Sequence, residues 1–396
     1  MKIVLVTTMT PTRDNINGAS AHPYHILKGR DKNIDVEVYS FNGNRLSHEG
    51  IKQVEQELNV TIKTFSSPKW ILWMIKFHLT FLKVFLKYPL WYYNIVPDWV
   101  IKEIKAKSPD GIWVYGHEMA RTIKALRPIK TVNMMPDCQS LYHYRMMGQR
   151  FVFWNSMMFW AQNFMYRKYL AMERDYSTNN VRYSLVGKED AKMLEKVHPG
   201  IDANFVHHPH YDVYEPKKVI KFSSPRIKVV LAGRNDLYMN QAADEFTTAL
   251  CSVNDISDKF EFTFLGKGWE QTVEILANHG YHVSHIKFAE DYKKELCNHD
   301  IQFTPICIGT GTKGKVLDAL ANGLLVLGTD YAMENIEVVD GESCLVYNKA
   351  EEAIDILRKI AADPEKYEQM AENGRQCIFK YHNRQQAAKE FFNLFR

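Results

Sequence analysis

A glycine-rich loop between two apolar runs constrains the fold of this chain more than any other feature. Residues 300–330 read DIQFTPICIGTGTKGKVLDALANGLLVLGTD: an apolar run leads into Gly309–Gly314, a short helical stretch follows, and a second apolar run begins at Leu324. This order of strand, loop, helix and strand is typical of a βαβ unit, whose strands lie parallel in one sheet. The free N–H groups at the helix start, together with the helix dipole, favour an anion there.

The composition of this loop indicates a phosphate site, and three kinds of site fit its letters. Three glycines, two threonines and two lysines in the seven residues from Gly309 are more than a plain turn requires. The dinucleotide fingerprint G-x-G-x-x-G fits Gly309, Gly311 and Gly314, with Asp330 at the end of the next strand. A Walker A loop, the second kind, does not match at its last position, because Val316 stands where that motif has a residue whose hydroxyl binds Mg²⁺. A third kind of phosphate loop belongs to a family that this chain resembles in other motifs as well.

Short apolar runs alternate with helical stretches along the whole chain, which predicts an α/β fold with largely parallel sheets. The strands expected in the first half are Lys2–Val6, Asp35–Phe41, Gly111–Tyr115, Thr131–Met134 and Val181–Val186. Those expected in the second half are Ile227–Ala232, Phe260–Leu265, Ile301–Ile306, Leu324–Gly328 and Cys344–Tyr347. Helices are expected near Ala21–Lys28, over Gln149–Met172, and in three pieces within 350–396. Ligands of such sheets bind beyond the carboxyl ends of the strands.

Length and composition restrict the class of protein. The 396 residues suffice for two domains of about 100–200 residues each. Hydrophobic residues make up 46%, which excludes a disordered chain, and the net charge of +4 is spread over interspersed acidic and basic residues, which does not indicate nucleic-acid binding. None of the six cysteines lies in a C-x-x-C pair, so we expect free thiols in a reducing cytoplasm rather than a zinc site or disulfide framework.

Two aromatic segments raise the question of a membrane. Trp70–Lys87 predicts a helix that is apolar around most of its circumference, with one polar stripe formed by Lys76, Thr80, Lys83 and Lys87. Phe151–Tyr166 is uncharged but short of the roughly 20 apolar residues that a membrane span needs. Both segments could lie on a bilayer surface, or both could be buried helices of the first domain. The apolar run at the N-terminus is too short for a signal peptide and predicts a strand.

The His- and Pro-rich stretch around residues 205–225 reads as a linker between domains. We therefore expect an N-terminal domain over 1–205, a linker over 206–225 and a second α/β domain over 226–380. A final helix would occupy 381–396.

An ordered series of motifs resembles the retaining family 4 glycosyltransferases, a large family with the GT-B fold. The series consists of Val230–Arg234 (a strand ending in Gly-Arg), Leu265–Gly268 (GxG), Val316–Gly323 (VLDALANG, similar to VLEALAxG), Asp340–Glu342 (DGE) and Asp363–Glu365 (DPE). The resemblance covers about 226–396 and is weaker over 1–205.

The resemblance implies two Rossmann-like domains facing each other across a cleft, with the C-terminal helix packing back on the N-terminal domain. It implies transfer of a sugar from a UDP- or GDP-sugar donor to a saccharide or lipid-linked acceptor, with retention, without a metal or other cofactor. The setting would be bacterial surface polysaccharide or glycolipid synthesis, in the cytoplasm or on the inner face of its membrane. An NAD-dependent oxidoreductase stays open, because Gly309–Gly314 matches the dinucleotide fingerprint. A degenerate glycosyltransferase-like binding protein also stays open, because Thr310 stands where the family has a glutamate and the second cation after Arg234 is missing.

The resemblance also implies roles for particular residues. The catalytic group would be Asp137, His117 and Arg234, the last because a guanidinium matches phosphate oxygens by paired hydrogen bonds. The donor diphosphate would be bound by Gly311, Thr312, Lys313, Gly314, Lys315 and Gly18. Thr310 would contact the donor sugar, Asp318 the ribose hydroxyls and Glu290 the base. The second cation of the family's diphosphate site is absent after Arg234, and Lys313 or Lys315 would supply it.

Overall fold

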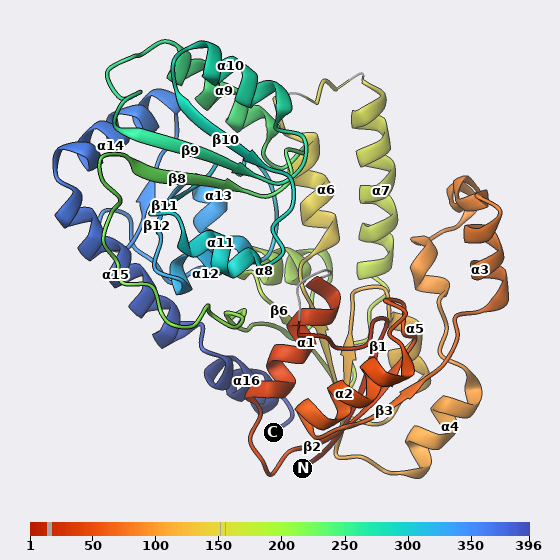
Figure 1. The fold of residues 1–396 in the computed structure, drawn as a ribbon. Coiled ribbons are helices and arrows are strands. Elements are labelled where there is room, and N and C mark those ends of the chain that lie inside the picture. The colour runs from red at the N-terminus through yellow and green to blue at the C-terminus, as the bar shows by residue number, and fades with distance from the viewer. Residues whose placement is uncertain (14–17, 151, 155) are drawn as a thin grey trace. The chain divides into compact units, whose positions relative to one another are not determined.

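The computed structural model describes residues 1–13, 18–150, 152–154 and 156–396, which form two compact units (Figure 1). Unit 1 comprises Met1–Pro209 and Arg384–Arg396, and unit 2 comprises His210–Asn383. Each unit is built around one parallel sheet.

The sheet of unit 1 has seven strands in the order β3-β2-β1-β4-β5-β6-β7. The strands are β1 (Lys2–Thr7), β2 (Asp35–Ser40), β3 (Thr61–Thr64), β4 (Gly111–Tyr115), β5 (Thr131–Met135), β6 (Val181–Leu185) and β7 (Ala203–Phe205). Every residue of β4 and β5 is buried, as expected for central parallel strands that helices cover on both faces.

The helices of unit 1 are α1 (Gly18–Gly29), α2 (His48–Leu58), α3 (Lys69–Lys76), α4 (Asp98–Ala106), α5 (Ala120–Ala125), α6 (Gln139–Met147), α7 (Met157–Glu173), α8 (Lys188–Val197) and α16 (Arg384–Asn393). Two 3₁₀ helices, η1 (Leu79–Phe85) and η2 (Leu90–Tyr93), follow α3. Helix α16 packs beside α1, and its Phe391 ring lies 4.6 Å from that of Trp113 in β4. The last helix of the chain thus contributes to the core of the N-terminal unit.

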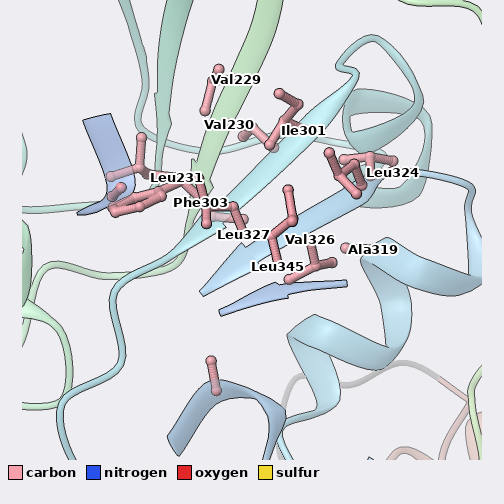
Figure 2. Packing of buried hydrophobic residues seen from close by; sticks show 14 of the residues in the cluster. Val229, Val230, Leu231, Ile301, Phe303, Ala319, Leu324, Val326, Leu327 and Leu345 are labelled. Carbon is pink, nitrogen blue, oxygen red and sulfur yellow. The ribbon is translucent and has the colours of Figure 1, made fainter. Parts of the chain in front are cut away.

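The sheet of unit 2 has six parallel strands in the order β10-β9-β8-β11-β12-β13, which is the doubly wound arrangement of Rossmann folds. The strands are β8 (Ile227–Ala232), β9 (Phe260–Leu265), β10 (His282–Ile286), β11 (Ile301–Thr304), β12 (Leu325–Gly328) and β13 (Leu345–Val346). Figure 2 shows side chains of β8, β11, β12 and α12 gathered in one core, among them Val230, Phe303, Val326 and Ala319.

The helices of unit 2 are α9 (Asn240–Cys251), α10 (Glu270–Asn278), α11 (Tyr292–Cys297), α12 (Gly314–Ala321), α13 (Asp330–Met333), α14 (Ala350–Ala362) and α15 (Pro364–Tyr381). Residues 206–226, between β7 and β8, form neither helix nor strand. Within the described residues, no helix has both the length and the hydrophobicity to cross a membrane.

All ten predicted strands are present, with ends that differ by at most two residues, but two predicted helices are wrong in extent. Trp70–Lys87 is two elements, α3 and η1, because His78 between them takes a left-handed conformation with φ 55°. The tract predicted over Gln149–Met172 contains one helix, α7, which starts eight residues later than predicted. The chain leaves α6 at Gly148 and starts α7 only after Ser156, whose side chain accepts the N–H of Phe159.

Of the two alternatives for these aromatic segments, the one that makes both of them buried helices is wrong. Of α3 only Ile71 is buried, and η1 has no buried residue. In the second segment Trp154, Met157 and Trp160 are exposed, while Phe151 lies outside the described residues.

Candidate functional site

The strand order of unit 2 reverses at β8, which pairs with β9 on one side and with β11 on the other. In doubly wound sheets ligands bind at such a reversal, outside the carboxyl ends of the two strands. The segments at this position are residues 233–239, which follow β8, and residues 305–313, which follow β11. They contain the Gly-Arg turn and the glycine-rich loop that the sequence singles out.

Two glycine turns position Arg234. The N–H of Gly233 donates to the carbonyl oxygen of Leu265 at 2.8 Å, and the indole N–H of Trp269 donates to the Gly233 carbonyl oxygen at 2.8 Å. Gly266 has φ 138°, and a Cβ there would overlap with the Gly233 carbonyl oxygen. The two turns therefore pack backbone against backbone. Arg234 follows them with an exposed side chain that no described residue engages in a hydrogen bond or ion pair.

We expect Gly266→Ala to lower the free energy of unfolding by about 2 kcal/mol or more, because the new methyl group meets backbone atoms and φ is strained. Gly280→Ala is the matched control in the same unit: its φ is 81°, but a Cβ there would have no atom within 4 Å. Urea unfolding of both variants measures the difference. Equal losses in the two variants would contradict the close packing of the two turns.

Helix α12 begins at Gly314 without a side-chain cap. The N–H groups of Val316 and Leu317 bond back to the Lys313 carbonyl oxygen, at 2.9 and 3.2 Å. The first N–H groups of a helix have no partner within it, so the start of α12 offers donors and a positive dipole end to an anion.

Lys313 is already engaged by its own loop. Its Nζ donates to the carbonyl oxygens of Thr310 and Gly311, at 3.2 and 3.1 Å. The carboxylate of Glu334 lies 3.5 Å from the same Nζ, and the Asn335 amide donates to the Gly311 carbonyl oxygen at 2.9 Å. Lys313 therefore shapes the loop and has an acidic partner that neutralises its charge.

Lys315 differs from Lys313 in having no such partner. Its half-buried ammonium forms no ion pair with a described residue, and it lies 3.3 Å from Met239 Sδ. A Cβ on Gly233 would clash with this ammonium, which places Lys315 beside the turn that carries Arg234. Burial lowers the pKa of Lys315, and the charge of Asp236 offsets this in part. Lys315 is thus the better candidate for the second cation.

Asp318, one helical turn after Lys315, is buried rather than solvated, with 7% of its surface exposed. Its carboxylate has no hydrogen bond or ion pair within the described part of the chain. Burial raises its pKa to about 7, although Lys293 opposes the shift. The same carboxylate contributes, after burial, to the raised pKa of Tyr292. A buried carboxylate without donors suits a ligand that brings hydroxyl groups.

Unit 1 brings two predicted residues, His117 and Asp137, to neighbouring strand ends. The His117 ring lies edge-on to Tyr169 at 5.7 Å, and His117 Nδ1 is buried without a hydrogen-bond partner in the described residues. The ring of His143 stacks on that of Tyr169 at 5.4 Å. Burial lowers the pKa of His143, and its hydrogen bond with Gln162 and the charge of Asp137 offset this in part. Polar groups thus surround one buried tyrosine.

Two acids complete this cluster: the half-buried Glu118, next to His117 at a predicted strand end, and the buried Glu173, which was not predicted. Glu118 accepts the Tyr169 hydroxyl at 3.0 Å, and burial raises the pKa of Glu118. Glu173, at the end of α7, accepts the N–H of Ser140 at 3.1 Å, and burial raises its pKa to about 7. No local sequence motif identifies Glu173 as a site residue, because only the tertiary fold brings it to the start of α6.

The remaining predicted residues lie in loops or at helix starts. Gly18 is the first residue of α1 in unit 1, and Glu290 is exposed between β10 and α11. Thr310 and Thr312 belong to the loop that Lys313 closes, and Gly311 has φ 61° there. No group of three or more His, Cys, Asp or Glu residues in the described ranges is arranged to hold a metal ion.

A family model matches part of this sequence, and solved structures match its fold. A family model described as glycosyl transferase-like matches residues 246–393. HepE of Anabaena, solved in complex with UDP, is 12% identical over 99% of both chains, with a TM-score of 0.64. Sucrose-phosphate synthase of Thermosynechococcus elongatus is 11% identical over 100% of this chain and 98% of its own, also with a TM-score of 0.64. The chain therefore has the GT-B fold, and residues 246–393 of its second unit and last helix match the glycosyl transferase-like family.

Other comparisons agree with this assignment. A glycosyltransferase of Rickettsia africae is 11% identical over 100% of this GT-B chain and 97% of its own, with a TM-score of 0.61. No curated protein sequence matches. The topology disfavours an oxidoreductase, since the dinucleotide fingerprint follows the first strand of a Rossmann sheet, whereas Gly309–Gly314 follows β11, the fourth strand of its unit.

Proposed function

We propose that this chain is a glycosyltransferase that moves a sugar from a nucleoside-diphosphate donor to a saccharide or lipid-linked acceptor. One observation carries the proposal: the half-buried Lys315, without an acidic partner, lies beside the turn of Arg234 and at the uncapped start of α12. Two cations and a helix start are suited to a diphosphate. HepE of Anabaena, which shares the fold, has been crystallised with UDP and with UDP-glucose.

In the proposed reaction the bond between sugar C1 and the diphosphate oxygen breaks, and its electron pair stays on the nucleoside diphosphate. Arg234, Lys315 and the N–H groups of α12 stabilise that charge as it develops. The acceptor oxygen forms the new bond to C1, and its proton passes to an oxygen of the departing phosphate. Retention of configuration and independence from a metal belong to the same proposal.

Other residues receive roles by the same reasoning. The carboxylate of Asp318 would accept the ribose hydroxyls, Thr310 would contact the donor sugar and Glu290 the base. His117 or Asp137 would orient the acceptor hydroxyl, and the buried Nδ1 of His117 favours that residue. We place the enzyme in bacterial surface polysaccharide or glycolipid synthesis, in the cytoplasm or at the inner face of its membrane.

A thermal-shift screen of UDP, GDP, ADP, CMP, their common sugars and NAD tests the proposal. We expect stabilisation by one nucleoside diphosphate and its sugars, since a ligand that binds only the folded state raises the melting temperature. Stabilisation by NAD alone would contradict the proposal. Release of free sugar or its transfer to an acceptor then separates an enzyme from a degenerate binding protein.

The role of Asp318 predicts that donor binding depends on pH. Because burial raises its pKa to about 7, the carboxylate is mostly protonated at pH 6 and mostly ionised at pH 8. The ionised form accepts hydrogen bonds from both ribose hydroxyls, so we expect the donor to bind about tenfold more tightly at pH 8. Titration calorimetry with a nucleotide sugar, whose diphosphate does not titrate in this range, measures the change.

Asp318→Asn is the control for this prediction. The variant should bind the donor more weakly at pH 8 and should lose the dependence on pH. The same pH dependence in Asp318→Asn would contradict the role of this carboxylate and would point to another titrating group, such as Glu173.

A further inference from the structure

The segment from Lys69 to Lys87, called here the α3–η1 surface, exposes more large apolar side chains than a solvated surface needs. Every residue from Ile75 to Phe85 is exposed. Trp73, Phe81 and Phe85 have 66%, 64% and 83% of their surface exposed. Single exposed apolar residues are ordinary, but a contiguous patch marks a surface that binds something.

The charge of this surface identifies the kind of partner. The stretch from Leu58 to Pro97 contains no Asp or Glu, although the chain has 46 acidic residues in 396. The α3–η1 surface itself carries four exposed lysines, which are Lys69, Lys76, Lys83 and Lys87. Aromatic side chains interleaved with lysines suit the boundary of a bilayer, where the rings enter the interface and the ammonium groups reach the lipid phosphates.

The base of the surface is fixed to the body of unit 1. Lys168 of α7, which is 6% exposed, donates to the carbonyl oxygens of Lys83, at 3.0 Å, and of Leu86. At the other end the ring of Trp70 contacts that of Tyr93 at 6.3 Å. Figure 1 shows α3 at the edge of unit 1, beside the layers that cover its sheet. The exposed rings therefore belong to a segment that contacts the rest of unit 1 at both ends.

We propose that the α3–η1 surface binds the anionic face of a lipid bilayer. A second copy of the chain is the less suitable occupant, because a symmetric contact would bring the four lysines of each copy together. Lipid binding does not depend on sugar transfer, so the two proposals can fail separately.

Co-sedimentation with vesicles tests this proposal on the full-length protein. We expect binding to phosphatidylcholine vesicles that contain about 30% phosphatidylglycerol, and at least about tenfold weaker binding to pure phosphatidylcholine. Raising the salt concentration should weaken the binding, since it screens lysine–phosphate attraction. Failure to bind anionic vesicles at low salt would overturn the proposal.

Two sets of substitutions separate the parts of the surface. The apolar variant Trp73→Ser/Phe81→Ser/Phe85→Ser and the charge variant Lys76→Glu/Lys83→Glu should each weaken binding to anionic vesicles at least about tenfold. The controls, Phe288→Ser and Lys359→Glu, change an exposed aromatic residue and an exposed lysine of unit 2 and should bind as the wild type does. Binding by the apolar variant at wild-type strength would contradict the proposal.

Self-association is measured alongside vesicle binding. Sedimentation equilibrium should find the wild type and the apolar variant in the same oligomeric state. A wild-type dimer that the apolar variant converts to monomer, with vesicle binding unchanged, would assign the surface to a second copy. Both variants should keep the thermal shift with the nucleoside diphosphate, because the substituted residues belong to unit 1, whereas Arg234, Lys315 and Asp318 belong to unit 2.

Discussion

Replacing Arg234 by alanine is expected to lower kcat at least about a hundredfold, because the diphosphate loses a preorganised cation as its charge develops. The fold should be little affected, since the exposed guanidinium contacts no described residue through a hydrogen bond or ion pair. We therefore expect the free energy of unfolding to change by no more than about 0.5 kcal/mol. Initial rates of sugar transfer and urea unfolding of the same variant measure the two quantities.

Arg234→Lys is the matched control for charge. An ammonium keeps the positive charge but cannot form the paired hydrogen bonds of a guanidinium, so activity should be restored only in part. Wild-type turnover in Arg234→Ala would contradict the assignment of this residue to the leaving group. A large loss of stability in Arg234→Ala would show that its role is structural.

The second large effect is expected from Lys315→Met, which should lower kcat about a hundredfold while making the protein slightly more stable. The half-buried ammonium has no acidic partner within 4 Å among the described residues, so the folded protein carries the cost of its desolvation. Methionine of similar length removes that cost, and we expect a gain of about 1 kcal/mol in the free energy of unfolding. Kinetics and urea unfolding are again measured together.

Lys313→Met provides the control, because it makes the same change two residues away. Lys313 is paired with Glu334 and holds two loop carbonyl groups, so its loss should destabilise the protein. The two stability changes should have opposite signs. This difference would indicate that Lys315 serves a ligand, whereas Lys313 stabilises the fold. Loss of stability in Lys315→Met would contradict the assignment of Lys315.

The central strands could be predicted because their sequences encode burial on both faces. GIWVY and IKVVLA, in β4 and β8, are nearly continuous apolar runs, which only a covered parallel strand needs. The edge strands β3 and β10 read TIKT and HVSHI, where polar residues interrupt the pattern. Their strand structure depends on pairing with β2 and β9, which is a tertiary effect.

The helix errors have comparable causes. Periodicity in Trp70–Lys87 fits a helix, but His78 interrupts it with a left-handed conformation, and the distant Lys168 donates to the carbonyl groups of Lys83 and Leu86. For Gln149–Met172 the signal for the late start was present and local, since Ser156 caps α7. Serine is a preferred N-cap residue, so Ser156 predicts that the helix starts at Met157.

Site residues were predictable where one short segment holds them together. The loop from Gly309 to Lys315 carries its own glycines and lysines, so its chemistry is visible in the sequence. The choice between Lys313 and Lys315 is not, because it depends on Glu334 and on Gly233, which the fold brings from other segments. The burial of Asp318 likewise follows from packing around α12 and not from its neighbours in sequence.

The most direct measurement for the central claim is titration calorimetry of a nucleoside diphosphate against its nucleoside, in the wild type and in Arg234→Ala/Lys315→Met. If the diphosphate binds at the start of α12 between the two cations, the wild type should bind the diphosphate at least about a hundredfold more tightly than the nucleoside. The double variant should lose most of that preference and keep its affinity for the nucleoside. A double variant that prefers the diphosphate as strongly as the wild type does would contradict the account.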